Sequence, residues 1–401
     1  MSKKIFFLFL VSAYFNVFAQ NSNRLHQIAV VADAHNDVLY NSIMPGQNIS
    51  YRLSTGHSDL YRFPEGGIDV QIFSVWCGPE YGRGKAFSYA NQMIDSLYAV
   101  AQRNPDKLEI VKSYAQLKKG LKQKKLVGLI GVEGGHMIED SMEYLDSLHK
   151  RGMAYMTLTW NNSTSWATSA LDEASPQPPP KEGEQNSAPK KKGLTDFGKQ
   201  IVRRMNELGI MLDLAHVGPQ TFFDAIAITS KPVIVSHSNS YVLTPFFRNI
   251  TDEQILAVKK NGGVICINFI AQFVDSSYQG KFNALLKQHQ KLVDSVKAIY
   301  STEVIANEKI AELLMPYINE IRPPLSKLMD HIDYVANLAG ADHVGLGSDF
   351  DGGTAFPLGM EDVTKFPVIT EELKKRGYSN KDIRKILGEN ILRVYKANVG
   401  R

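Results

Sequence analysis

Imidazole and carboxylate side chains stand at the ends of several apolar runs along this chain of 401 residues. Both groups are ligands that suit Zn²⁺, with Mn²⁺, Co²⁺ and Fe²⁺ as alternatives. A metal ion held by such a set can activate water for hydrolysis. The candidate metal ligands are His35, Asp37, Glu133, His216 and His237.

The spacing and number of these groups favour a metal site over separate structural roles. His35 and Asp37 are two residues apart, so both side chains lie on the same face of an extended strand. A single histidine at a strand end is more often a hydrogen-bonded structural residue than a ligand. Several imidazoles and carboxylates buried together, however, cost free energy unless a cation compensates them. The remaining histidines are expected to be structural, and His136 is the best candidate among them for a supporting contact.

The scaffold must bring the ends of separate strands together. Eight runs rich in Val, Ile and Leu lack strict alternation, which is typical of strands covered on both faces. They span residues 28–34, 68–76, 126–132, 153–160, 210–215, 232–236, 263–269 and 343–348.

Segments of helical character lie between these strands. One helix is expected to begin after Thr195 and to end at Gly209, and the others run through residues 86–103, 140–151, 219–229 and 251–261. This alternation predicts an α/β fold, a (β/α)8 barrel of the TIM type, with its active site at the carboxyl ends of the strands. A doubly wound open sheet is the alternative, but no glycine-rich fingerprint follows the first strand.

The segment 20–401 is expected to form a single catalytic domain in which two segments interrupt the pattern. Residues 172–192 combine proline and charge with no apolar residue larger than alanine, which predicts a mobile surface loop. Residues 276–340 predict one or two helices around a proline-bearing turn at 322–324. Neither resembles a separate domain, because strands on both sides are needed to close the barrel.

The first 19 residues have the features of a cleaved secretory signal peptide. Lys3 and Lys4 precede an apolar run over 5–18, and Ala19 is a small residue at the expected cleavage point. The run is shorter than the ~20 residues of a membrane-spanning helix, so cleavage is favoured over a retained anchor. The protein is therefore expected in the periplasm or outside the cell.

The net charge gives no support to two classes of partner. Removal of the first 19 residues, which carry two lysines and no acid, lowers the formal net charge from +4 to +2. This balance favours neither nucleic acid nor an anionic membrane. Cys77 and Cys266 each lie in an apolar run, so both are expected to be small buried residues, with one disulfide as the alternative after export.

Several longer strings give the chain a family resemblance. It resembles the membrane (renal) dipeptidases, a family of binuclear zinc peptidases related to the amidohydrolase barrels. The resemblance runs from about Val30 to Val394. It rests on the strings DAHND, GVEGGH, LTDFGKQIVRRMNELGIMLDLAHV, PVIVSHS, FFRNITDEQI and GLGSDFDGG, in family order and with family-like spacing.

The resemblance implies two Zn²⁺ ions per chain and a division of the ligands between them. One metal would be held by His35, Asp37 and Glu133, and the other by Glu133, His216 and His237. Glu133 would then bridge the two ions. A hydroxide between the two metals would be the nucleophile that attacks the peptide carbonyl. The resemblance also suggests a homodimer.

Two further roles follow from the same resemblance. Arg248, eleven residues after His237, would receive the terminal carboxylate of a dipeptide substrate, and Asp349 would be the acid/base. Strand alternation alone does not choose between Asp349 and Asp351 as the proton carrier.

The chain departs from the family at one position. Where many members have a histidine that hydrogen-bonds the substrate, this chain has Trp160. An indole N–H can donate a hydrogen bond but cannot accept one or carry a proton. Trp160 is therefore expected to contact the substrate and to alter substrate range and rate, without affecting the metal site.

Two other functions remain as alternatives. The same metals could serve an amidohydrolase that acts on N-acyl amino acids or a β-lactam ring. A non-catalytic exported binding protein could keep the barrel and use residues 172–192 as its contact segment, but this reading predicts a damaged metal set. All five candidate ligands and Asp349 are present.

Overall fold

The structure is a computed structural model that describes residues 22–174, 192–300 and 303–400. The expected signal peptide and most of the proline-rich segment lie outside the described residues. Within the described residues, no helix is long and apolar enough to cross a membrane.

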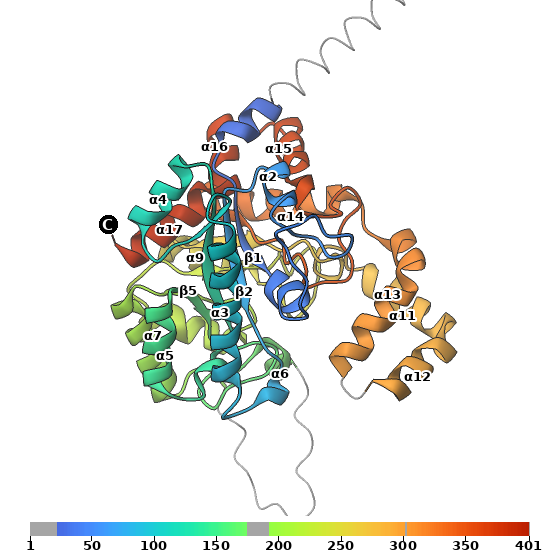
Figure 1. Ribbon diagram of the computed structural model, residues 1–401, viewed down its shortest axis with the longest axis horizontal. Helices are drawn as coiled ribbons and strands as arrows, with labels where there is room; N and C mark the ends of the chain where they lie inside the picture. The colour runs from blue at the N-terminus through green and yellow to red at the C-terminus, as the bar shows by residue number, and fades with distance from the viewer. Residues whose placement is uncertain (1–21, 175–191, 301–302, 401) are drawn as a thin grey trace, which may run out of the picture.

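Eight parallel strands form a nearly closed barrel, which confirms the predicted (β/α)8 fold (Figure 1). In order around the barrel they are β1 (Ala32–Asn36), β2 (Val70–Val75), β4 (Leu126–Glu133), β5 (Met153–Thr157), β6 (Met211–Asp213), β7 (Ile234–Val235), β8 (Val264–Ile267) and β9 (Val344–Leu346).

The barrel closes where the first strand meets the chain beyond the last one. The Asp37 N–H donates to the Phe350 carbonyl at 2.9 Å, and the Asp349 N–H donates to the His35 carbonyl at 3.1 Å. Closure therefore places Asp349 beside His35, although the two residues are far apart in sequence.

The strands lie between two apolar layers, as their lack of alternation predicted. In β2, Val70 and Ile72 belong to one hydrophobic cluster, and Phe73 and Val75 belong to another. All residues of the barrel strands are buried. Burial on both faces explains why these runs consist mainly of Val, Ile and Leu.

The predicted helices are present on the outside of the barrel. They are α3 (Ala86–Arg103), α5 (Met142–Arg151), α7 (Asp196–Leu208), α8 (Pro219–Ile228) and α9 (Asp252–Asn261). The Thr195 side chain caps α7 by accepting a hydrogen bond from the Gly198 N–H, and Gly209 ends the helix with a φ of 79°. The local sequence thus sets both ends of this helix.

Other elements complete the surface. The helices are α2 (Arg62–Glu65), α4 (Tyr114–Lys122), α6 (Ala170–Ala174), α15 (Phe366–Lys375), α16 (Asn380–Arg384) and α17 (Asn390–Val399). Short 3-10 and π segments are η1 (Leu39–Ile43), η2 (Pro79–Tyr81), η3 (Gly135–Ile138), η4 (Ala341–His343), η5 (Val363–Lys365) and η6 (Lys385–Glu389).

Three details differ from the expectations. A short strand, β3 (Leu108–Ile110), pairs with β4 outside the barrel path and was not predicted, because three residues carry too little periodicity. Residues 172–174 belong to α6 rather than to a loop. The predicted run 153–160 ends as a strand at Thr157, since ladder pairing stops where the chain turns into the barrel rim.

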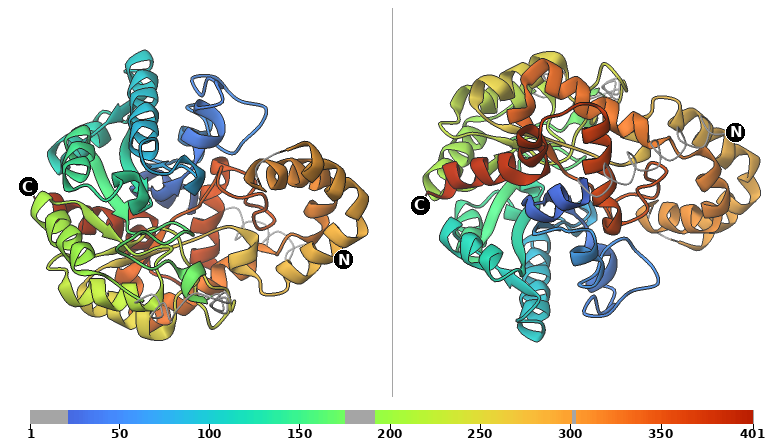
Figure 2. Two further views of the ribbon diagram at one scale, coloured as in Figure 1. Left: turned by 90° about the horizontal axis from the view of Figure 1, so that it is seen from below. Right: turned by 90° about the horizontal axis from the view of Figure 1, so that it is seen from above.

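The segment 276–340 is more elaborate than the one or two helices expected. After α10 (Ala271–Val274) come α11 (Tyr278–Gln288), α12 (Gln290–Ile299), α13 (Glu303–Ile321) and α14 (Leu325–Ala339). The proline-bearing turn separates α13 from α14, as predicted. Helices α11, α12 and α13, here called the helical lobe, stand beside the barrel (Figures 1 and 2). The lobe has its own hydrophobic cluster, which includes Leu285, Val293, Val296, Ile310 and Leu314.

Candidate metal centre

The five candidate ligands and Asp349 lie together at the carboxyl ends of the barrel strands. They lie at or just after the ends of five strands: His35 and Asp37 at β1, Glu133 at β4, His216 after β6, His237 after β7 and Asp349 after β9. All six are buried.

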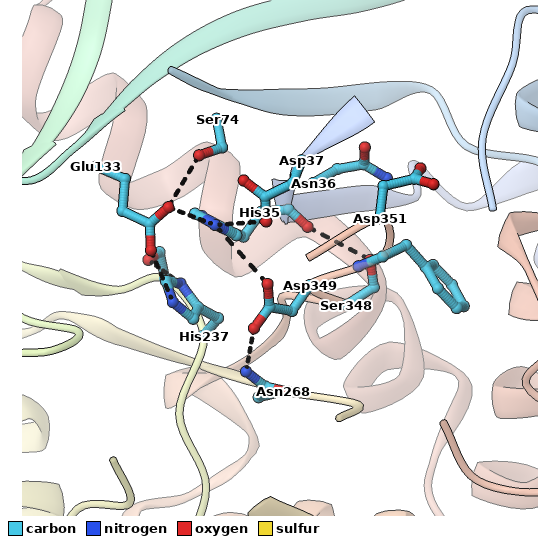
Figure 3. Close-up of polar contacts among 12 residues, drawn as sticks. His35, Asn36, Asp37, Ser74, Glu133, His237, Asn268, Ser348, Asp349 and Asp351 are labelled. Carbon is cyan, nitrogen blue, oxygen red and sulfur yellow. Dashed lines mark hydrogen bonds and ion pairs between the residues drawn. The ribbon is translucent and has the colours of Figure 1, made fainter. Parts of the chain in front are cut away.

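Glu133 lies between the histidines. Its Oε1 is 2.8 Å from His216 Nε2 and 3.5 Å from His237 Nε2, and its Oε2 is 3.3 Å from His35 Nε2 (Figure 3). The Nε2 atoms of His216 and His237 are 3.0 Å apart. One oxygen of the Glu133 carboxylate thus faces His216 and His237, and the other faces His35. This arrangement suits a carboxylate that bridges two metal ions.

His35 Nε2 faces carboxylates on several sides. It is 3.5 Å from Asp37 Oδ2 and 4.0 Å from Asp349 Oδ1, yet this buried nitrogen makes no hydrogen bond. Two sets of side chains place their donor atoms close enough to hold a cation. They are His35, Glu133 and His237, and His35, Asp37 and Asp349. The orphaned nitrogen and the converging oxygens both fit a bound metal ion.

The opposite nitrogen of each histidine is held by a neighbouring side chain. His35 Nδ1 is 2.7 Å from the Tyr155 hydroxyl, and His216 Nδ1 is 3.0 Å from Asn161 Oδ1. Ser236 Oγ lies 2.8 Å from His237 Nδ1. Such contacts orient metal-binding imidazoles and set their tautomer. These supporting residues, Tyr155, Asn161 and Ser236, were not predicted from the sequence. A polar residue after a strand was the only signal for Asn161 and Ser236, whereas Tyr155 lies inside β5 and had no such signal.

His136, the supporting contact expected from the sequence, lies elsewhere. Its Nε2 is 3.0 Å from the Cys77 carbonyl oxygen, and its pKa is lowered by burial. Both cysteines are buried and free, and burial raises the pKa of Cys77 to about 12.

The electrostatics of the cluster keep two imidazoles neutral. Burial lowers the pKa of His216 to about 3 and that of His237 well below its usual value. Burial alone would raise the pKa of Glu133, but the charge of His35 and the contact with His216 hold it well below the ordinary range. Neutral imidazoles and an ionised carboxylate are the forms that bind metals.

Asp349 is the carboxyl group with the opposite shift. Burial raises its pKa to about 8, opposed by His35 and reinforced by the carboxylates of Asp37 and Glu133. The Asn268 amide donates a hydrogen bond of 2.7 Å to its Oδ2. Asp349 and Asp351 both have a left-handed backbone, with φ of 61° and 65°.

The two carboxylates diverge despite that shared conformation. Asp349 faces His35, whereas Asp351 points away from the donor set (Figure 3) and its Oδ1 accepts a 2.7 Å hydrogen bond from the His57 N–H. Gly352 follows directly, and a side-chain carbon there would lie 2.2 Å from Asp37 Oδ2 and 2.5 Å from Asp349 Oδ1. Only glycine permits this approach of the backbone to the carboxylates.

A cavity of about 500 Å³ opens over the donor set and includes Arg248 and Trp160 in its wall. Arg248 is only 3% exposed, donates a 3.4 Å hydrogen bond to the His237 carbonyl and leaves its Nε without a partner. Burial lowers its pKa to about 10, which leaves the guanidinium charged at neutral pH. Arg248 is therefore a buried cation in the cavity wall.

Trp160 lies in the cavity wall on the side of His216. Its ring centroid is 4.9 Å from that of Trp76 and 6.2 Å from that of His216. Trp76 in turn packs edge-on against Tyr40, with centroids 4.5 Å apart. The three aromatic residues form a continuous apolar surface on this side of the cavity.

The barrel and its rim of imidazoles and carboxylates together define the class of metal-dependent hydrolases with a TIM-type fold. The sequence model of the membrane dipeptidase family, peptidase family M19, matches residues 19–400. The chain therefore belongs to this family, which confirms the resemblance noted in the sequence. Membership makes the protein a metallopeptidase of the dipeptidase class.

Solved structures show the same fold. The dipeptidase AC, a metallopeptidase, is 24% identical with a TM-score of 0.74, over 93% of this chain and 99% of that one. A probable dipeptidase from Pseudomonas aeruginosa is 23% identical with a TM-score of 0.78, over 96% and 99%. A metallopeptidase from Rhodobacter sphaeroides is 23% identical with a TM-score of 0.72, over 92% and 99%.

Proposed function

We propose that this protein is an exported binuclear zinc dipeptidase that hydrolyses dipeptides with a free terminal carboxylate. The observation that carries the substrate assignment is the buried guanidinium of Arg248, which lines the same cavity as the metal donor set. A buried cation with an unpartnered N–H calls for an anionic group to bind it.

The five ligands predicted from the sequence would hold two metal ions that share Glu133. His35, Asp37 and Glu133 would hold one ion, and Glu133, His216 and His237 the other, with Zn²⁺ favoured over Mn²⁺, Co²⁺ or Fe²⁺. When bound, the metals supply Lewis-acid activation of water and of the peptide carbonyl.

Asp349 is the residue that moves the proton. Its Oδ2 is fixed by Asn268, so Oδ1 is the oxygen that faces the donor set. That oxygen would accept a proton from the attacking water and donate it to the departing amine.

Arg248 positions the substrate. Two parallel hydrogen bonds from a guanidinium to a carboxylate fix the orientation as well as the location of the bound group. A longer peptide has its next residue where the carboxylate would bind, so it is excluded. The Rhodobacter sphaeroides metallopeptidase is liganded with a phosphinate mimic of the dipeptide L-Ala-D-Ala. That neighbour supports a dipeptide as the substrate here.

Trp160 would contact the other end of the substrate. It lies on the side of His216, with Trp76 behind it, where the amino-terminal residue of a dipeptide would extend. The indole supplies an apolar surface and one N–H donor. We expect it to influence the choice of the first residue of the substrate.

The substrate assignment is tested by replacing Arg248. Arg248→Ala should lower kcat/KM on a free dipeptide by roughly 30-fold or more, because loss of one partner of a desolvated charge pair costs about 2 to 5 kcal/mol. The same dipeptide with an amidated carboxyl terminus should be affected much less, since it never made the contact.

Arg203 on α7 is exposed and provides a matched control. Arg203→Ala should leave both substrates unaffected. An N-acetyl amino acid measured alongside separates a dipeptidase from an acyl-amino-acid hydrolase. Equal losses on the free and amidated dipeptides with Arg248→Ala would show that this residue does not bind the carboxylate.

Export and dimerisation are tested separately. Amino-terminal sequencing of the protein recovered from outside the cytoplasm should give a first residue close to Gln20. Light scattering would distinguish a homodimer from a monomer.

A further inference from the structure

The cavity over the donor set extends well past the space that a dipeptide backbone requires. Its volume of about 500 Å³ is in the range of clefts that hold drug-sized ligands. One end is formed by the metal donor set and the aromatic surface around Trp160. The other end is formed by residues of α10 and of the helical lobe.

The wall at the lobe end is apolar where it is buried. It consists of Phe273, Phe282, Leu286, Val293, Ile310 and Ala311. Five of these, all except Phe273, belong to the hydrophobic cluster of the helical lobe or pack against it. Phe282 and Leu286 lie four residues apart on one face of α11. Polar lining residues at this end, such as Asn283 and Lys297, are exposed. We call this surface the lobe wall.

The lobe wall begins beside the proposed carboxylate site. The Arg248 guanidinium carbon is 5.6 Å from the centre of the Phe273 ring, and the Phe246 ring is 5.0 Å from that of Phe273. The α-carbon of the terminal residue carries both the carboxylate and the side chain. A carboxylate held by Arg248 therefore directs that side chain, rather than the side chain of the first residue, toward the nearest open apolar surface.

We propose that the lobe wall is a specificity pocket for the carboxyl-terminal residue, and that the preferred substrates are dipeptides with a large apolar side chain at that position. This inference rests on the proposed dipeptidase function. The pocket buries the apolar side chain of the carboxyl-terminal residue against the lobe. The amino-terminal residue then lies against the aromatic surface around Trp160.

The first test is a pair of substrate series on the metal-loaded protein. In the series Ala-Gly, Ala-Leu and Ala-Phe, kcat/KM should rise by about tenfold or more from the first to the others, because even one methylene group that fits an apolar pocket is worth about tenfold. In the reverse series Gly-Ala, Leu-Ala and Phe-Ala the rise should be clearly smaller.

The second test fills the pocket. Leu286 is half-buried and lines the cavity, whereas Leu313 on α13 is 44% exposed and does not. Leu286→Trp should remove most of the preference for Ala-Phe, by about fivefold or more, and leave turnover of Ala-Gly within about twofold. Leu313→Trp should change neither. Retained Ala-Gly turnover shows that each variant is folded.

A third variant opens the pocket and separates its role from general packing. Phe282→Ala should lower kcat/KM for Ala-Leu and raise it for dipeptides with a larger aromatic side chain at the carboxyl-terminal position. The kcat/KM for Ala-Gly should again be unaffected.

The possible outcomes distinguish this inference from the proposed function. Turnover of all dipeptides at equal rates, or a Leu286→Trp loss that is equal on Ala-Gly and Ala-Phe, overturns the pocket and leaves the dipeptidase intact. Absence of turnover on every free dipeptide, with metal bound, overturns the proposed function itself. In that case, calorimetric binding of Ala-Phe and Ala-Gly still tests the pocket, and equal affinities would reject it.

Discussion

Two sets of buried carboxylates lie at the rim of the same barrel, and they are satisfied in different ways. Asp213 accepts hydrogen bonds from the Ser236 N–H at 2.9 Å, the Ser236 hydroxyl at 2.7 Å and the Thr157 hydroxyl at 2.5 Å. Asp33 accepts from the Ser348 N–H and hydroxyl, both at 2.7 Å. These two carboxylates have their partners supplied by the neighbouring strands.

The carboxylates of the metal centre instead converge on one another. Glu133, Asp37 and Asp349 all face the unpartnered Nε2 of His35. A buried carboxylate is therefore structural where local donors satisfy it and points to a cation where several share one unsatisfied space. Burial alone does not distinguish the two.

The two sets are also connected. The Ser236 hydroxyl that donates to Asp213 is adjacent to His237 Nδ1, and Ser348, which bonds Asp33, directly precedes Asp349. The satisfied carboxylates hold the elements that carry the metal donors. They are positioning residues, and their removal should affect stability before chemistry.

The largest expected effect separates the two sets directly. Glu133→Gln should abolish metal binding and reduce turnover to that of the metal-free protein, because the amide cannot bridge two cations. Asp213→Asn should retain bound metal and lower the free energy of unfolding by about 1 to 3 kcal/mol, the cost of impaired buried hydrogen bonds.

Elemental analysis and urea unfolding of both variants provide the measurement. Full metal occupancy in Glu133→Gln would remove the distinction between the two sets.

The next largest effect is expected when Asp349, the proposed proton carrier, is replaced. Asp349→Asn should lower turnover by about 10²- to 10⁴-fold with metal content unchanged, which is the usual share of general acid-base catalysis. Asp351→Asn is the matched control, since Asp351 bonds to His57 and points away from the donor set. Steady-state rates on one dipeptide decide between them. The reverse ranking would make Asp351 the proton carrier.

A smaller effect concerns the cost of ionising a satisfied carboxylate. Burial raises the pKa of Asp33 to about 6, above its ordinary value of 3.8. Between these values the unfolded chain is ionised while the folded chain remains protonated. The resulting stabilisation is complete below the lower pKa and is lost as the pH rises through about 6.

Metal-free wild type should therefore lose stability relative to Asp33→Asn by on the order of 3 kcal/mol between pH 4 and pH 7. Thermal unfolding of both proteins at the two pH values measures the difference. A pH-independent difference would show that Asp33 is ionised in the folded protein across this range.

The smallest effect is expected at Trp160, which lines the cavity and is not a neighbour that supports either set of carboxylates. Trp160→His removes the ring contact with Trp76, and Trp160 is not among the side chains whose donor atoms converge at the metal centre. We expect KM for a dipeptide with a large first residue to rise by about three- to tenfold, with kcat and metal content little changed. A collapse of kcat would instead place this position in the chemical step.

Much of this protein is readable from its sequence because the relevant signals are local. Apolar runs without alternation predicted the barrel strands, and Thr195 and Gly209 predicted the ends of α7. Polar residues directly after those runs identified the groups that now lie together at the rim. The helical lobe was underestimated, because its helices pack mainly against one another rather than against the barrel.

Other features depend on contacts between residues that lie on different elements of the fold, and only the tertiary structure decided them. Closure of the barrel brings Tyr155 to His35 and Asn161 to His216. It also directs Asp349 and Asp351 to different neighbours, although strand alternation alone would place them on one face. Burial of Arg248 likewise follows from how the loop after β7 packs against α10. The sequence by itself determined which groups could bind metal, because side-chain chemistry and strand ends are local properties. Their partners, charges and directions were decided by packing, because these depend on which distant side chains share the same buried space.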